Sequence, residues 1–307
     1  MHYLSVALTI KTKWFDSLKE WFLWNKFIGV DHFYIVDDNN ERPLRRLFAN
    51  FSDDITFIDE IDPDICMPQK EMFDIIYNKH RDESHWFAFI DDDEYIMSLQ
   101  DVEFIDFLKY FEHKKSVELT ARFFGPHGYT QHEGLEAHKH SLILDRYWLY
   151  ESKPLVKSIV NSKLVSSFDE ASGSNIHRLA TDQAVNCFGH DIEPLDETIM
   201  PSWAEVKLSN NRGRIHNPSY VINHYGLKSL QEIEYKLFER GFVQGERVSK
   251  DPLTYRNHKL LLKLFSTTYS INPHHKGNFN NFHFHTILPD VRKRFKQYFD
   301  FYIQKFA

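Results

Sequence analysis

The sequence predicts an α/β fold, with a mixed sheet flanked by helices and a helical C-terminal extension. Short apolar, β-rich runs alternate with stretches whose apolar residues repeat at helical spacing, and two of these runs end abruptly in aspartates. The chain has 307 residues, 42% hydrophobic and 26% charged, so it can bury a large core. This composition excludes disorder and collagen-like order, and the two cysteines exclude a disulfide framework or a thiolate metal site.

The first elements predict a β-α-β order. Residues 3–10 form a short β-branched run, and the apolar positions that follow share one helical face until Gly29 ends the helix. The run HFYIVDD over 32–38 is typical of a buried strand that reaches the edge of a sheet. We then expect a helix over 42–49, a strand over 55–58 and a helix over 69–81 that begins after Pro68.

Another apolar strand covers 86–90 and ends in four consecutive acidic residues, 91–94. Ligands of an open α/β sheet bind outside the carboxyl ends of its strands, so this acidic end and the one at Asp37 and Asp38 should open on one crevice. The remaining expected elements are a helix over 101–112, strands over 117–123, 142–149 and 155–160, a polar loop over 167–180, and helices over 229–240, 256–265 and 289–306.

Charge is distributed unevenly. The net charge is −7, yet residues 256–307 hold nine lysines and arginines against two acidic residues, which leaves −14 for the rest. An acidic body with a basic tail is not typical of nucleic-acid binding, but it suits an anionic membrane surface. We expect a domain over 1–245 and a basic helical extension over 246–307 packed on it. With no signal peptide and no long apolar run, the sequence favours a cytoplasmic protein, peripheral to a membrane at most.

The four consecutive acids are the sharpest chemical signal. Carboxylates about 4 Å apart repel one another unless a cation or a proton intervenes. On an extended segment Asp91 and Asp93 would point to the same side and could share one ion, while Asp92 and Glu94 point elsewhere. Oxygen ligands suit Mg²⁺ or Mn²⁺, whose other positions are commonly filled by water and substrate phosphates. A solvated acidic turn is the alternative, and neither an EF-hand loop nor a glycine-rich phosphate loop is present.

Three segments together resemble the metal-dependent glycosyltransferases of the GT-A fold, specifically glycosyltransferase family 92 and its family-2-like relatives. They are KEWFLWNKFIGVDHFYIVDDN, WFAFIDDDEYI and INHYGLKSLQEIEYKLFERG, and the similarity spans most of residues 3–245. The resemblance implies a GT-A type, Rossmann-like mixed sheet and a nucleotide-sugar donor with UDP as its nucleotide. Galactose is a candidate sugar that no residue of the sequence selects. The resemblance also implies a glycan or glycoconjugate acceptor.

The resemblance implies that Mn²⁺ or Mg²⁺ binds Asp91 and Asp93, the ends of an Asp-x-Asp segment. Asp37, with Asp38 beside it, is similar in position to the group that contacts the nucleoside. Further candidates for contacts to the donor are Lys11, Gln69, Asp92, Lys157 and His177. For Lys157 and His177 the alternatives are an ordinary sheet-surface lysine and a loop histidine.

The segment VINHYGLKS reads as a strand leading into a helix. His224 at the strand end could complete the metal site and Lys228 could face phosphate, and the resemblance implies the same roles. A core histidine and a solvated helix start are the alternatives, and Lys236 farther along could be surface charge. Two positions depart from the family pattern: Asn25 stands where a histidine is common, and IKTKWFD replaces an Asn-Glu pair, whose contact Lys11 could supply.

Sugar transfer with inversion needs a base that takes the proton of the acceptor hydroxyl. The leading candidate is Asp182, with Glu133 and Asp169 behind it. Asp182 could instead cap a helix that the pattern predicts to begin there. Histidines in the tail have spacings that could suggest zinc, but exposed histidines need no metal.

Two other classes of function stay open from the sequence. A nucleotidyltransferase or pyrophosphohydrolase would use the same acidic crevice and metal, but it would act on phosphorus. A non-catalytic carbohydrate-binding module would suit the 16% aromatic content, although not the carboxylate cluster. The product released from nucleotide sugars distinguishes these classes from a glycosyltransferase.

Overall fold

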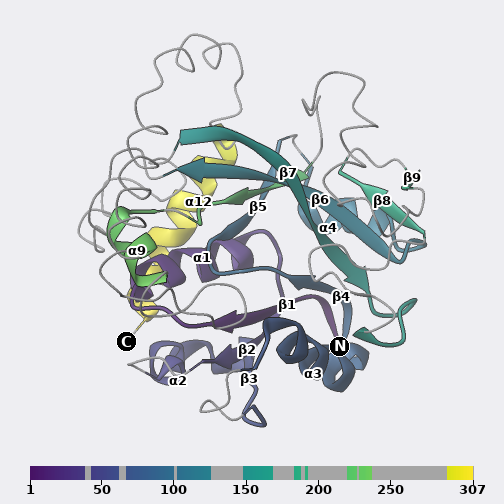
Figure 1. Ribbon diagram of the computed structural model, residues 1–307, viewed down its shortest axis with the longest axis horizontal. Coiled ribbons are helices and arrows are strands. Elements are labelled where there is room, and N and C mark those ends of the chain that lie inside the picture. The colour runs from purple at the N-terminus through teal and green to yellow at the C-terminus, as the bar shows by residue number, and fades with distance from the viewer. Residues whose placement is uncertain are drawn as a thin grey trace, which may run out of the picture.

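In the computed structural model, helices flank both faces of one mixed sheet (Figure 1). The residues that the structure describes are 1–38, 43–61, 67–99, 102–125, 148–168, 183–187, 191–192, 220–226, 228–236 and 289–306. This architecture confirms the predicted fold class, and it is consistent with a Rossmann-like sheet of the GT-A type.

The strands are β1 (His2–Ile10), β2 (His32–Asp37), β3 (Ile55–Phe57), β4 (Ser84–Phe89), β5 (Glu94–Ser98), β6 (Ser116–Gly125), β7 (Trp148–Asn161), β8 (Ala184–Asn186), β9 (Asp191–Ile192) and β10 (Tyr220–His224). Eight of them lie in the order β3-β2-β1-β4-β7-β6-β10-β5, and β8 pairs with β6 and with β9. Strands β1 to β4 are parallel to their neighbours within this group, whereas β7 is antiparallel to both β4 and β6. The carboxyl ends of β1, β2 and β4 therefore meet at one edge of the sheet.

The helices are α1 (Phe15–Phe27), α2 (Leu44–Leu47), α3 (Gln69–His80), α4 (Phe104–Tyr110), α9 (Leu230–Tyr235) and α12 (Pro289–Tyr302), with short 3₁₀ turns η1 (Ala49–Asp54), η2 (Arg81–Glu83) and η6 (Ile303–Lys305). Alternate residues of β1 pack on opposite faces: Leu4, Val6 and Leu8 join the core under α1, and Ala7 joins the core under α3. The two helices thus cover opposite sides of the sheet, as Figure 1 shows.

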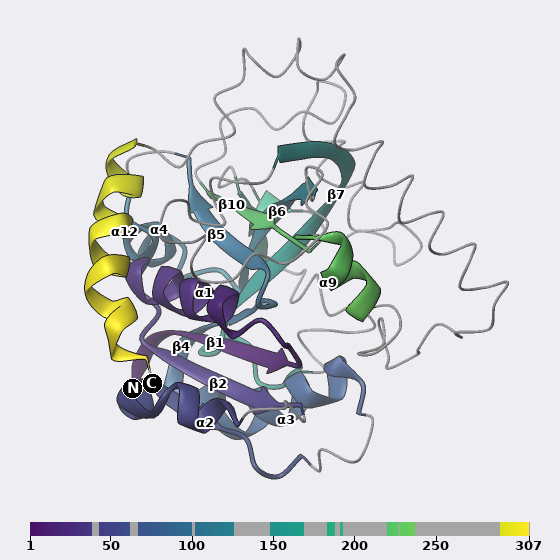
Figure 2. The ribbon, with the colours of Figure 1, turned by 90° about the vertical axis from the view of Figure 1, so that its left-hand side faces the viewer.

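The C-terminal helix α12 packs against α1 and crosses it at a steep angle (Figure 2). Phe295 and Phe299 are buried in the core, and the ring of Phe295 meets that of Trp24 edge to face, with centroids 4.8 Å apart. Arg292 and Lys293 on the outer side of α12 are exposed. Within the described ranges, no helix has the length and apolar character needed to span a membrane.

Some predicted elements differ in extent. The two strands expected over 142–149 and 155–160 overlap a single strand, β7, and the helix expected over 101–112 is limited to α4. Residues 184–186 form β8, so the prediction of a helix that begins at Asp182 is wrong for these residues. They pair with β6, with Ala184 opposite Ser116, and this tertiary pairing overrides the local helical propensity. The helix expected over 256–265 lies outside the described residues.

His32, the first residue of β2, provides a test of the packing at the edge of the sheet opposite the carboxyl ends of β1, β2 and β4. Its side chain is 6% exposed, its Nε2 lies 2.9 Å from Thr56 Oγ1, and its ring stacks on His2 with centroids 4.2 Å apart. Burial, with a further contribution from His2, lowers the pKa of His32 from 6.5 to about 4.

We expect the free energy of unfolding to fall as the pH drops from 6.5 towards 4, because the unfolded chain takes up a proton that folded His32 does not. Urea unfolding at several pH values should show a shallower fall for His32→Gln, while the same change at exposed His113 should leave the slope unchanged. Identical slopes for wild type and His32→Gln would contradict this prediction.

Candidate active site

The acidic residues 91–94 form a tight turn between β4 and β5. The backbone N–H of Glu94 donates to the carbonyl of Asp91 at 3.0 Å, and the indole N–H of Trp21 donates to the carbonyl of Glu94 at 2.8 Å. The segment is therefore not extended, and the prediction that Glu94 points away from the site is wrong. Strand β5, which begins at Glu94, is one of the strands that sequence patterning did not anticipate, together with β8 and β9.

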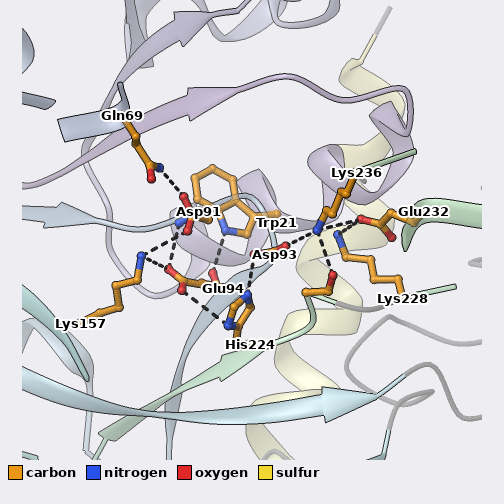
Figure 3. Close-up of polar contacts among 11 residues, drawn as sticks. Trp21, Gln69, Asp91, Asp93, Glu94, Lys157, His224, Lys228, Glu232 and Lys236 are labelled. Atoms are coloured by element: carbon orange, nitrogen blue, oxygen red, sulfur yellow. Dashed lines mark hydrogen bonds and ion pairs between the residues drawn. The ribbon is translucent and has the colours of Figure 1, made fainter. Parts of the chain in front are cut away.

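Asp91 is held from two sides (Figure 3). The Gln69 amide at the start of α3 donates to Asp91 Oδ1 at 2.7 Å, and the Lys157 ammonium on β7 lies 3.2 Å from Oδ2. Burial alone would raise the pKa of Asp91, but the Lys157 charge and the Gln69 hydrogen bond outweigh it and hold the pKa below its ordinary value. Gln69 and Lys157 thus lie beside the acidic turn, and their predicted contacts with a donor stay predictions.

Glu94 and Lys157 form a buried ion pair beneath this turn. Their side chains are 2% and 5% exposed, and the ammonium lies 3.0 Å from Glu94 Oε2. Glu94 Oε2 also accepts the backbone N–H of Asp91 at 3.0 Å. Burial raises the pKa of Glu94 despite Lys157, whereas the carboxylates of Asp91 and Glu94 overcome burial and raise the pKa of Lys157. Lys157 therefore joins β7 to the turn as a buried counter-ion.

Asp93 lies between His224 at the end of β10 and Lys236 just after α9 (Figure 3). His224 Nε2 is 3.3 Å from Asp93 Oδ1, and Lys236 Nζ donates to Oδ2 at 2.7 Å. Burial opposes ionisation, but Lys236, His224 and Lys228 together hold the pKa of Asp93 well below its usual range. Conversely, Asp93 overcomes burial to raise the pKa of His224.

Lysines and a carboxylate from the β10–α9 region surround Asp93. Lys236 donates to the carbonyl of Gly226 at 3.0 Å and lies 3.4 Å from Glu232 Oε1. Lys228, which is only 2% exposed, lies 3.6 Å from the same oxygen of Glu232. Residues 228, 232 and 236 are spaced four apart, so Lys228 and Lys236, which flank α9 on either side, bring both ammonium groups to one carboxylate next to the acidic turn.

Gly226 packs directly against the imidazole of His224. A Cβ placed on Gly226 would lie 2.7 Å from Nε2 of His224, closer than real Cβ contacts allow. The absence of a side chain at Gly226 therefore lets the ring stand where it meets Asp93.

The second acidic strand end makes different contacts. Asp37 Oδ2 accepts the backbone N–H of Leu44 at 2.9 Å and so supports the start of α2. Asp38 lies 3.9 Å from the ammonium of Lys11, with both side chains partly exposed. Asp38 and Lys11 thus form one pair at the end of β1 and β2, and their predicted contact with a nucleoside stays a prediction.

Several predicted residues lie outside the described part of the chain. They are the three candidate bases Asp182, Glu133 and Asp169, the candidate donor contact His177, and the tail histidines. Their roles stay predictions. The described structure instead adds Glu94, Glu232 and Lys236, of which Lys236 had a usable signal, its spacing of eight residues from Lys228 on a predicted helix.

Two side chains have the geometry of adjacent ligands of one cation. Asp93 Oδ1 is buried and makes no well-formed hydrogen bond among the described residues, although His224 Nε2 lies 3.3 Å away. Octahedral ligands at about 2.1 Å from a metal lie about 3.0 Å from their neighbours, so a divalent cation fits this pair. In the described ranges no three His, Cys, Asp or Glu side chains form a metal-binding group. The fit is thus to a cation with two protein ligands, Asp93 and His224. Mg²⁺ and similar ions commonly complete their coordination with water and substrate phosphates.

No protein-family model matches the chain, and a search of curated proteins finds no match. Among solved structures, it is similar to S. aureus TarS 1–349, with a TM-score of 0.31, 13% identity and coverage of 53% of this chain and 48% of that one. In a longer S. aureus TarS structure the match covers 22% of that chain.

Two further structures are similar to the same extent. HddC from Yersinia pseudotuberculosis has a TM-score of 0.29 and 11% identity, covering 53% of this chain and 79% of that one. A UDP-glucose pyrophosphorylase complexed with UDP-glucose has a TM-score of 0.29 and 12% identity, covering 73% and 90%. Similarities with TM-scores this low identify neither a family nor a substrate for this chain.

Proposed function

We propose that the protein is a metal-dependent glycosyltransferase that moves a hexose from a nucleotide sugar to a hydroxyl of a glycan or glycoconjugate, with inversion. The observation that carries the proposal is the pair of buried Asp93 and partly exposed His224, which fits a divalent cation next to Lys228 and Lys236. A cation bound by carboxylate and imidazole and flanked by ammonium groups is complementary to a diphosphate. We propose UDP as the nucleotide, as the family resemblance implies, and galactose as a candidate sugar.

Different residues of the site would have different roles in the reaction. A divalent metal, when bound, would supply Lewis-acid stabilisation of the departing diphosphate. Lys228 and Lys236 are positioned to offset charge that grows on the leaving group as the glycosidic bond breaks. Gln69 and Lys157 fix the turn that carries Asp93, so that little rearrangement is needed when substrate binds.

Incubation with a panel of nucleotide sugars, Mn²⁺ and glycan acceptors tests this function. Release of nucleoside diphosphate with transfer of the sugar supports the proposal. Release of monophosphate or pyrophosphate would instead indicate an enzyme that acts on phosphorus, and binding without turnover would indicate a carbohydrate-binding module. Failure of wild type with every donor would overturn the proposal, and so would turnover by Asp91→Ala and Asp93→Ala at the wild-type rate.

Gly226→Ala is expected to raise the Mn²⁺ concentration that gives half-maximal turnover by about tenfold, because the new Cβ displaces the His224 ring from Asp93. A metal titration of turnover at saturating donor measures this shift. His224→Ala, made in parallel, should cause a shift at least as large. If Gly226→Ala had the metal dependence of wild type, Gly226 would have no role in placing the imidazole.

A further inference from the structure

The described site carries nearly balanced charge before any cation binds. Four carboxylates, those of Asp91, Asp93, Glu94 and Glu232, face the ammonium groups of Lys157, Lys228 and Lys236 and the imidazole of His224. The sequence led us to expect that a metal offsets the repulsion of the acidic residues. In the folded chain, internal lysines already do so.

Lys236 is the lysine placed to compete directly with a cation. Its side chain is 12% exposed, and its ammonium lies within 3.4 Å of three acceptors, Asp93 Oδ2, the Gly226 carbonyl and Glu232 Oε1. Three acceptors match the three N–H donors of an ammonium group. The ammonium of Lys236 contacts Oδ2 of Asp93. A divalent cation bound to Oδ1 of the same carboxylate would therefore be repelled by this nearby positive charge.

A diphosphate removes this conflict. Its oxygens would give Lys236 and the neighbouring Lys228 new acceptors, and its negative charge would compensate the divalent cation. The two lysines lie next to each other before any diphosphate binds, because their ammonium groups are 3.6 and 3.4 Å from the same oxygen of Glu232. No other protein group is needed to bring them together.

We propose that Lys236 is a positioning residue that acts as the internal counter-ion of Asp93 in the free protein and makes divalent-cation binding dependent on the nucleotide diphosphate. This inference rests on the proposed function for the identity of the diphosphate. Its central claim concerns the free protein: the ammonium opposes the cation at Asp93. Lys157 has a different role, since its ammonium lies between the carboxylates of Asp91 and Glu94.

Mn²⁺ binding, followed by the electron paramagnetic resonance of the free ion with and without UDP, tests the inference. We expect Lys236→Met to bind Mn²⁺ about tenfold more tightly than wild type without nucleotide, and UDP to tighten Mn²⁺ binding far less in the variant than in wild type. Donor turnover should nevertheless fall, by about a hundredfold in kcat/KM. Lys236→Arg, which keeps the charge, should retain the weak Mn²⁺ binding of wild type.

The opposite signs of these effects separate the possible roles. A purely structural lysine would weaken both Mn²⁺ binding and turnover when replaced, and a bystander would change neither; either result overturns the inference. Lys109→Met, at a side chain that is 56% exposed on α4, is the matched control and should bind Mn²⁺ like wild type. If Lys236→Met does not fold, Mn²⁺ binding to wild type with and without UDP still tests the inference. An affinity for Mn²⁺ that UDP does not increase would overturn it.

The outcome is distinguishable from failure of the proposed function. Tighter Mn²⁺ binding in Lys236→Met, with no nucleotide sugar consumed by wild type, would refute the glycosyltransferase proposal and leave the counter-ion role intact. Sugar transfer by wild type together with unchanged Mn²⁺ affinity in Lys236→Met would support the glycosyltransferase proposal and refute the counter-ion role of Lys236.

Discussion

Asp93→Asn is expected to lower kcat/KM for sugar transfer by about a thousandfold. The amide has nearly the shape of the carboxylate, but it carries no charge for a cation and presents an NH₂ group to His224 or Lys236. Loss of one well-placed electrostatic contact in a buried site costs up to about 4 kcal/mol of transition-state stabilisation, which corresponds to this factor. Steady-state release of nucleoside diphosphate at saturating Mn²⁺ measures the effect.

The control for this prediction is Asp106→Asn on α4, where the same chemical change affects a side chain that is 65% exposed and paired only at the surface with Lys109. Activity within twofold of wild type is expected there. Circular dichroism and thermal melting establish that Asp93→Asn is folded. A folded Asp93→Asn protein with more than a tenth of wild-type activity would mean that Asp93 does not hold the cation.

The position of the site follows from the sequence, because it depends on features that are local in the chain. Apolar runs that stop at aspartates predict strand ends, and the order of the first elements predicts parallel pairing, which brings those ends to one edge. The placement of His224 at the end of a strand follows in the same way. These features give where strands end and in which direction they run, but not that β4 lies beside β1 or that β10 lies beside β5 and so brings His224 to the acidic turn.

The network of counter-ions depends on distant pairing and could not be read from the sequence. Lys157 reaches Asp91 and Glu94 because β7 runs antiparallel beside β4, with Ala88 opposite Ile159. No periodicity in the sequence specifies that register. The same holds for Lys236, whose contact with Asp93 joins residues 143 positions apart. From the sequence alone, a lysine in a strand or helix is interpreted as a surface residue, because the carboxylate that it pairs with in the fold is not known.

Lys157→Met is expected to destabilise the protein by about 3–5 kcal/mol. The substitution removes the positive charge that neutralises Asp91 and Glu94, and Glu94 is almost completely buried. Removing one partner of a buried ion pair costs more than removing both, since the remaining charge cannot reach water. Glu94→Gln in the Lys157→Met background should therefore restore part of the lost stability, with a coupling of about 1–3 kcal/mol.

Urea unfolding of wild type, both single variants and the double variant completes this cycle, with Lys109→Met as the surface control that should change the free energy of unfolding by less than about 0.5 kcal/mol. Stability of Lys157→Met within 1 kcal/mol of wild type would show that water or another group replaces the ammonium. Additive effects of the two substitutions would show that Lys157 does not stabilise Glu94. Strong coupling would establish that the acidic turn is held by a lysine of β7 before any metal or substrate binds.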